Sequence, residues 1–120
     1  MYVVTRNEQG VPFIIDCNKL FHNSIGFARE EVMGKPMADF YSPESQTQLL
    51  EGGGFARALA GDFVMGERQL VARDGTVINT LLYTRPETDA SGLVIPILFL
   101  NCNLQVFKVG HRAKSFWVVL

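Results

Sequence analysis

Apolar and polar residues alternate most clearly from Met65 to Tyr83, where two runs rich in aliphatic and β-branched residues flank the pair Asp74-Gly75. Asp-Gly is typical of a two-residue type I′ turn, because glycine adopts a positive φ freely and aspartate tolerates one. The sequence therefore predicts a β-hairpin with Asp74-Gly75 as its loop. The facing pairs expected from that loop are Arg73 with Thr76, Val71 with Ile78, and Leu70 with Asn79.

The alternation in this hairpin is imperfect, because Glu67, Arg68 and Asn79 interrupt both faces. We interpret this as one face partly in water and the other over a core that contains some polar groups. A bulge near Gly66 explains the same interruption equally well.

Shorter elements precede the hairpin. Asn18 is a candidate N-cap of a first helix, which Gly26 ends. Ser42-Pro43-Glu44 predicts the start of another helix, with a serine cap, a proline at the first helical position and an acid next. The pattern predicts strands at 2–5 and 12–16, a helix from 18 to 26, single turns at 29–33 and 37–41, and a helix from 42 to 52.

Three consecutive glycines, Gly52 to Gly54, end that helix, because each costs roughly 1 kcal/mol relative to alanine inside a helix. A second helical segment is expected from Phe55 to Gly61. Residues 86–92 read as a polar turn, and residues 93–100 as the last strand. Strands separated by a block of helices predict an α+β fold, with an antiparallel sheet and helices on one face.

Composition narrows the function classes. The 120 residues fit one domain, and 48% hydrophobic content indicates a folded chain. The net charge of −1 predicts neither nucleic acid nor direct membrane contact as a partner. The chain starts without a signal-peptide pattern, and two cysteines suit a reducing compartment, so we expect a cytoplasmic protein.

Several motifs in this order resemble the PAS family of sensory domains. The resemblance spans about residues 2–105, and the central motif is the run from Ile25 to Lys35, with its Gly-Phe, Glu-Glu and Gly-Lys pairs. The other matching residues are Asp16, Asn18, Asp39-Phe40, Ser42-Pro43-Glu44, Ala58 to Gly61, Glu67-Arg68, Arg73-Asp74-Gly75 and Gly92.

The resemblance implies a five-stranded antiparallel sheet with short helices covering one face, and a small apolar ligand cavity between the two layers. The residues expected to line it are Ile14, Phe40, Leu50, Phe55, Leu59, Leu70, Asn79, Leu81, Tyr83 and Phe99. The family often ends its last strand with Asp-Ile-Thr, whereas this chain has Asn103-Leu104-Gln105. Residues 106–120 lack the heptads of a coiled-coil output helix, so the predicted domain is 1–105 and residues 106–120 form an extension, linker or docking strand.

No cofactor or metal is predicted. Cys102 lies in the expected last strand, where it does not match the flavin-adduct motif of light-sensing relatives, and Cys17 is interpreted as a buried thiol. The segment from Pro43 to Gly61, which carries the histidine in haem-binding relatives, contains none. His22 and His111 stand at spacings from the cysteines that do not match a zinc site.

Polar residues of the hairpin offer weaker candidates. Glu67, Arg68 and Arg73 form either an anion-binding cluster or ordinary cross-strand pairs, and we favour the pairs. Gln69, Asn79 and Tyr83 either face a cavity, where a ligand partners them, or face solvent.

These observations predict a sensory or interaction module of a cytosolic signalling protein, of the histidine kinase or diguanylate cyclase type, and not an enzyme. Expected partners are an output domain in the same parent chain and a second copy of this one. A ligand-free homodimerisation module is the alternative, because the tail ends in the apolar run Phe116 to Leu120. A small α+β enzyme is the third hypothesis, for which only Asp16 and Asp39 are candidate acids.

Overall fold

The computed structural model describes residues 1–101, 106–111 and 114–119, and the side chains of residues 1–101 other than Leu50. Its helices are α1 (Lys19–Ile25), α2 (Arg29–Val32), the 3₁₀ turn η1 (Met37–Phe40), α3 (Pro43–Glu51) and α4 (Gly54–Leu59). Its strands are β1 (Tyr2–Glu8), β2 (Val11–Cys17), β3 (Val64–Val71), β4 (Val77–Thr88), β5 (Val94–Asn101), β6 (Val106–His111) and β7 (Lys114–Val119).

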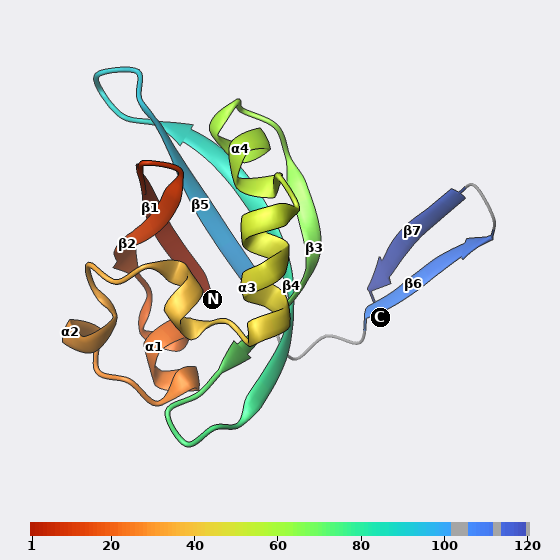
Figure 1. Ribbon diagram of the computed structural model, residues 1–120, viewed down its shortest axis with the longest axis horizontal. Helices are drawn as coiled ribbons and strands as arrows, with labels where there is room; N and C mark the ends of the chain where they lie inside the picture. Colours follow the sequence, from red (N-terminus) through yellow and green to blue (C-terminus); the bar gives the residue numbers. More distant parts are fainter. Residues whose placement is uncertain (102–105, 112–113, 120) are drawn as a thin grey trace.

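The first five strands form one antiparallel sheet in the order β2-β1-β5-β4-β3 (Figure 1). The helices cover one face of this sheet, which confirms the predicted fold class. Strands β6 and β7 pair with each other in a second, two-stranded sheet. None of the helices is long and apolar enough to cross a membrane, within the part of the chain that the structure describes.

Short local signals start and stop the helices as expected. The Asn18 side chain accepts the N–H of Phe21, and Gly26 closes α1 with a φ of 76°. The Ser42 hydroxyl accepts the N–H of Ser45 at the start of α3. The chain leaves helical geometry at Gly53, whose φ is 70°, so α3 and α4 are separate helices.

The register of the β3–β4 hairpin differs by one residue from the prediction. Leu70 pairs with Ile78, and Gln69, not Leu70, pairs with Asn79. The loop holds three residues, since the Ala72 N–H bonds the Thr76 carbonyl, and only Gly75 in it has a positive φ. A three-residue loop with glycine at its last position uses the same Asp-Gly pair differently from a type I′ turn. Pairing is regular past Gly66, so no bulge lies there.

The predicted turn at 86–92 was too long. Strand β4 continues through Pro86, which pairs with Pro96 of β5, and the turn is confined to the residues between Thr88 and Val94. Strand β3 begins at Val64, which pairs with Thr84, so Pro86 lies beyond the β3–β4 ladder. The missing N–H of Pro86 therefore leaves no gap in that ladder.

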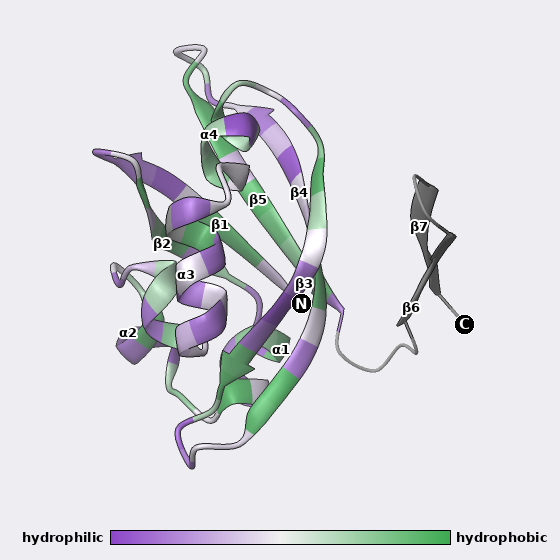
Figure 2. Cartoon of the chain, turned by 45° about the vertical axis from the view of Figure 1, so that its right-hand side comes forward, coloured by the Kyte–Doolittle hydropathy of each residue, from purple (hydrophilic) through white to green (hydrophobic). Residues whose placement is uncertain are grey.

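The core fills the space between the sheet and the helices. Strand β5 is apolar on both faces and lies at the centre of the sheet, whereas α3 is largely polar (Figure 2). The buried core cluster consists of Val3, Ile14, Cys17, Phe21, Ile25, Val32, Met37, Phe40, Tyr41, Leu70, Leu82, Leu98 and Leu100.

An aromatic row crosses the opposite, helix-free face. The rings of Tyr83 and Phe99 stack with centroids 4.9 Å apart and an interplanar angle of 10°. Tyr2 flanks Phe99 at 6.5 Å and Phe63 flanks Tyr83 at 6.1 Å. Phe63 is 59% exposed and Tyr2 is 36% exposed, so this row is only partly covered by its own chain.

Candidate functional site

A small cavity, here called the inner cavity, lies between the helix layer and strands β3 to β5. Its volume is about 30 Å³, roughly twice what one water molecule needs. It is lined by Pro12, Tyr41, Gln48, Leu49, Gly54, Phe55, Val64, Arg68, Leu82, Thr84 and Leu98. Most of this lining is apolar, which makes its few polar atoms the features that select an occupant.

Two of those polar atoms have no hydrogen-bond partner. The Tyr41 hydroxyl and the Nε of Arg68 are both buried and unpartnered among the residues with described placement. A third polar group, the Thr84 hydroxyl, already accepts the N–H of Val64 at 3.1 Å. Buried polar atoms are almost always hydrogen-bonded in folded proteins, so two orphans in one cavity indicate a missing partner.

The local sequence explains why these two side chains point inward. Tyr41 forms an isolated antiparallel bridge with Leu70, and the next residue donates its N–H to the Gln69 carbonyl at 2.9 Å. Arg68 lies two residues before buried Leu70 and thus on the same face of β3. Gly66 leaves room for it, because a Cβ there would lie 3.0 Å from Nη1 of Arg68.

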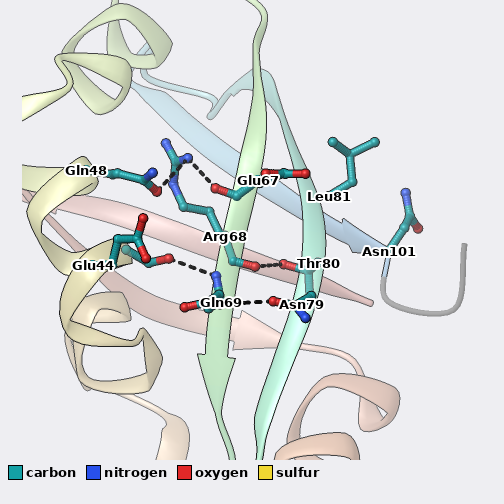
Figure 3. Close-up of a pocket in the computed structure, with 10 residues that line it drawn as sticks. Glu44, Gln48, Glu67, Arg68, Gln69, Asn79, Thr80, Leu81 and Asn101 are labelled. Atoms are coloured by element: carbon teal, nitrogen blue, oxygen red, sulfur yellow. Dashed lines mark hydrogen bonds between the residues drawn. The ribbon is translucent and has the colours of Figure 1, made fainter. Parts of the chain in front are cut away.

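A larger pocket of about 240 Å³, here called the edge pocket, adjoins the inner cavity along β3 and α3 (Figure 3). Arg68 and Gln48 line both spaces. Nη1 of Arg68 donates to the Glu67 carbonyl at 2.7 Å and to Oε1 of Gln48 at 3.4 Å. The remaining lining residues are Glu44, Ser45, Glu67, Gln69, Asn79, Thr80, Leu81 and Asn101.

Burial also sets the protonation state of the site. Tyr41 is 3% exposed, and this burial raises its pKa to about 12, although the nearby charge of Arg68 acts in the opposite direction. A tyrosine is protonated at neutral pH even at its ordinary pKa of 10.0, and burial extends that neutral state to higher pH. The inner cavity presents a neutral hydroxyl and a cationic N–H donor to whatever fills it.

A family model described as PAS fold matches residues 3–102. The chain belongs to the PAS family. The match covers the five-stranded sheet and all of the helices, and thus the whole inner cavity of this PAS domain.

Solved structures show the same fold. The PAS domain of a protein from Colwellia psychrerythraea has a TM-score of 0.68 at 22% identity, over 84% of this chain and 83% of that one. The Drosophila melanogaster Cycle PAS-B with bound ethylene glycol has a TM-score of 0.68 at 15% identity, over 85% and 99% of the two chains. The PAS domain of the fruit-fly ELK potassium channel reaches 0.66 at 16% identity, over 85% of each chain. No curated protein sequence matches the chain.

The predicted cavity residues separate into four places in this PAS domain. Phe55 lines the inner cavity, and Leu59 lies half-buried on the same helix. The core cluster contains Ile14, Phe40 and Leu70. The edge pocket contains Asn79, which is exposed, and Leu81. The aromatic row contains Tyr83 and Phe99.

Of the predicted lining with described side chains, only Phe55 therefore borders the inner cavity. The largest departures are Tyr83 and Phe99, which lie on the helix-free face. Leu82 and Leu98 are their chain neighbours and face the cavity instead, because successive strand residues point to opposite faces. The side chain of Leu50 lies outside the described residues. The predicted lining omitted Tyr41 and Arg68. Arg68 was considered only for an anion-binding cluster or a cross-strand pair, although its two-residue spacing from Leu70 was a usable signal for the cavity face.

The other candidate groups are not brought together. Arg68 faces inward, whereas Arg73 forms an ion pair with Glu31 of α2. Among the described residues, Glu67, Arg68 and Arg73 therefore form neither the anion-binding cluster nor the cross-strand charge pairs considered for them. Gln69 donates from its amide to Oδ1 of Asn79 at 3.1 Å and accepts the Ser42 hydroxyl at 3.0 Å, so it is bound at the sheet edge.

Cys17 is buried, as predicted, and burial raises the pKa of its thiol. His22 lies on α1, and its Nδ1 is 3.1 Å from the Phe27 carbonyl oxygen. It is not among the residues that line the inner cavity. Cys102 and the side chain of His111 lie outside the described residues. Within those residues, no three His, Cys, Asp or Glu side chains are grouped closely enough to hold a metal ion.

Proposed function

We propose that this PAS domain is a sensory module whose signal is the occupancy of the inner cavity by a small molecule. The observation that supports this most directly is the pair of unpartnered buried atoms, Tyr41 Oη and Arg68 Nε, in a cavity large enough for more than one water. The family match supports a sensory or interaction role. An occupant that binds one packing of helices and sheet more tightly than another shifts the population between them.

The elements around the cavity are suited to such a shift. Helix α4 supplies Gly54 and Phe55 to the lining and contacts β3, β4 and β5. It is joined to α3 through Gly52 and Gly53. Strand β5 supplies Leu98 to the lining and comes immediately before residues 102–120 in the sequence. Movement of α4 against the sheet is therefore coupled to the segment that leaves the domain.

The proposed context is a cytoplasmic signalling protein in which an output domain of the histidine kinase or diguanylate cyclase type follows this module. We propose no catalytic step within the domain. We also propose neither flavin nor haem as its ligand, because the lining residues that the structure describes include no cysteine or histidine and the inner cavity holds about 30 Å³.

A thermal-unfolding screen against small molecules of two to six heavy atoms, with native mass spectrometry of the fresh protein, tests the sensory proposal. We expect binders to raise the unfolding midpoint of the wild type and to lose that effect in Leu98→Phe, which fills the cavity. Leu20→Phe, at a 56% exposed position on α1, is the matched control. A visible flavin or haem band, or stabilisation that Leu98→Phe leaves unchanged, would contradict it.

The aromatic row favours homodimerisation as a second candidate function. Tyr2, Phe63 and Met65 are 36%, 59% and 42% exposed on the same face, and exposed apolar surface of this kind marks interaction sites. We expect Tyr83→Glu to dissociate a dimer in sedimentation experiments, while Leu20→Glu on the helix layer leaves it intact. A wild-type chain that is monomeric at every concentration, with and without residues 106–120, would exclude this function.

A further inference from the structure

Within the described part of the chain Arg68 makes no close ion pair, although Glu44 and Glu67 line the edge pocket with it. Among the same residues its guanidinium contacts only the neutral oxygens of Glu67 main chain and Gln48 side chain. Arginine is protonated under all ordinary conditions and carries only donors. A half-buried guanidinium with a free Nε–H therefore favours an anionic acceptor nearby.

Tyr41 adds a second donor to the same cavity. Its hydroxyl is unpartnered, and the one other hydroxyl among the described lining residues, on Thr84, is engaged with the main chain of Val64. These described lining residues include no carboxylate. Two donors without an acceptor between them are satisfied together by a group with two acceptor oxygens.

The rest of the lining defines the other end of the occupant. Apart from Arg68, Tyr41, Gln48 and Thr84, the inner cavity is lined by residues without a polar side chain. These are Pro12, Leu49, Gly54, Phe55, Val64, Leu82 and Leu98. A volume of about 30 Å³ restricts the occupant to a few heavy atoms. An oxygen-rich head with a short aliphatic tail matches both parts.

We propose that the inner cavity binds a short-chain monocarboxylate, with its carboxylate between Arg68 Nε and the Tyr41 hydroxyl and its tail against Leu82 and Leu98. The inference rests on the proposed function and assigns its ligand class. The edge pocket provides the approach, because Arg68 and Gln48 line both spaces. The ligand draws the guanidinium inward, away from its long 3.4 Å contact with Gln48.

Titration followed by NMR tests the ligand class directly. Sodium acetate, propionate and butyrate are added to ¹⁵N-labelled protein at constant ionic strength, with sodium chloride, propionamide and 1-propanol as probes of charge and shape. We expect a saturable shift of the Arg68 Nε–H resonance with the carboxylates, and binding of propionamide and 1-propanol that is weaker by about tenfold or more.

Three variants assign the contacts. Tyr41→Phe removes one hydrogen bond and weakens propionate binding about tenfold, and Arg68→Met removes the charge and weakens it further. Arg85→Met, on the helix-free face, is the matched control and binds like the wild type. If Arg68→Met fails to fold, Arg68→Lys carries the test, because it keeps the charge and loses the Nε donor.

The outcomes separate the ligand class from the sensory proposal. Binding of the neutral probes without binding of the carboxylates would overturn the monocarboxylate assignment and leave the cavity proposal standing. Failure of both classes to shift any lining residue would overturn both. Equal propionate affinity in wild type and Arg68→Met would place the anion elsewhere and also overturn the assignment.

Discussion

Arg73, in the loop between β3 and β4, forms an ion pair with Glu31 of α2, 42 residues earlier in the chain. The same side chain donates from Nε to the Gly26 carbonyl at 3.2 Å and lies 5.0 Å from the centroid of the Phe27 ring. Its main-chain N–H bonds the Ile25 carbonyl at 2.8 Å. One residue therefore fastens the tip of the β3–β4 hairpin to the helix layer.

This contact predicts an unequal pair of substitutions. Glu31→Gln is expected to cost less than about 1 kcal/mol of unfolding free energy, because both partners are about half exposed and water screens the pair. Arg73→Ala is expected to cost more, since it also removes the Gly26 hydrogen bond and the ring contact. Urea unfolding measures both, with Arg85→Ala as the control for an exposed ion pair with Glu87. Equal costs for the two variants would contradict this assignment.

The start of α3 supports a second prediction. The Ser42 hydroxyl caps the helix through Ser45 and donates to Gln69 at the edge of β3. Ser42→Ala should cost about 1–2 kcal/mol of unfolding free energy, since it removes a cap and a bond between layers. Thr47→Ala, on the same helix, loses only an exposed bond to the Pro43 carbonyl and should cost under about 0.5 kcal/mol. Similar unfolding midpoints for both variants would show that Ser42 does not join the layers.

The alkaline titration of Tyr41 supports a third prediction. Its pKa rises from 10.0 to about 12 on burial, so the folded state favours the neutral phenol. The resulting stabilisation is complete below pH 10 and is lost as the pH rises from 10 through about 12. An absorbance titration should show one late-ionising tyrosine that is absent in Tyr41→Phe and kept in Tyr83→Phe. A wild-type curve that Tyr41→Phe leaves unchanged would place the late group elsewhere.

The sequence predicted the parts of the fold that depend on local chemistry. Asn18, Ser42 and Gly26 stand where a cap or stop is needed, and each acts in the structure as expected. The hairpin register was wrong because Asp-Gly serves two loop lengths, and in the structure the loop also takes in Arg73, which binds the helix layer. Such a tertiary contact leaves no trace in the local pattern.

The cavity was harder to predict because strand faces follow from the register. The one-residue difference in the hairpin separates Tyr83, on the aromatic row, from Leu82, on the cavity lining. Arg68 was assigned to a cross-strand pair on the wet face, because no other acidic or basic residue was expected to converge there. Gly66 is the sequence feature that fits the observed position of Arg68, because the missing side chain at Gly66 leaves space for the Arg68 guanidinium.

Gly52 and Gly53, between α3 and α4, and Gly54, the first residue of α4, support the last prediction, because a Cβ would meet different surroundings at each of them. A Cβ on Gly52 would lie 2.5 Å from the Gln48 carbonyl oxygen, so Gly52→Ala must distort the end of α3 at a cost of about 1–3 kcal/mol. Gly53 has open space around it but a φ of +70°, so Gly53→Ala should cost about 1 kcal/mol.

Gly54 has neither constraint, because a Cβ there would make an ordinary 3.4 Å contact with Val64. Gly54→Ala should therefore be neutral or stabilise the fold by up to about 1 kcal/mol, through the lower entropy of the unfolded chain. Urea unfolding of the three variants measures the order. If Gly54→Ala were the most destabilising of the three, α4 would have to pack against β3 more tightly than this structure shows, and the movement proposed for signalling would lose its physical basis.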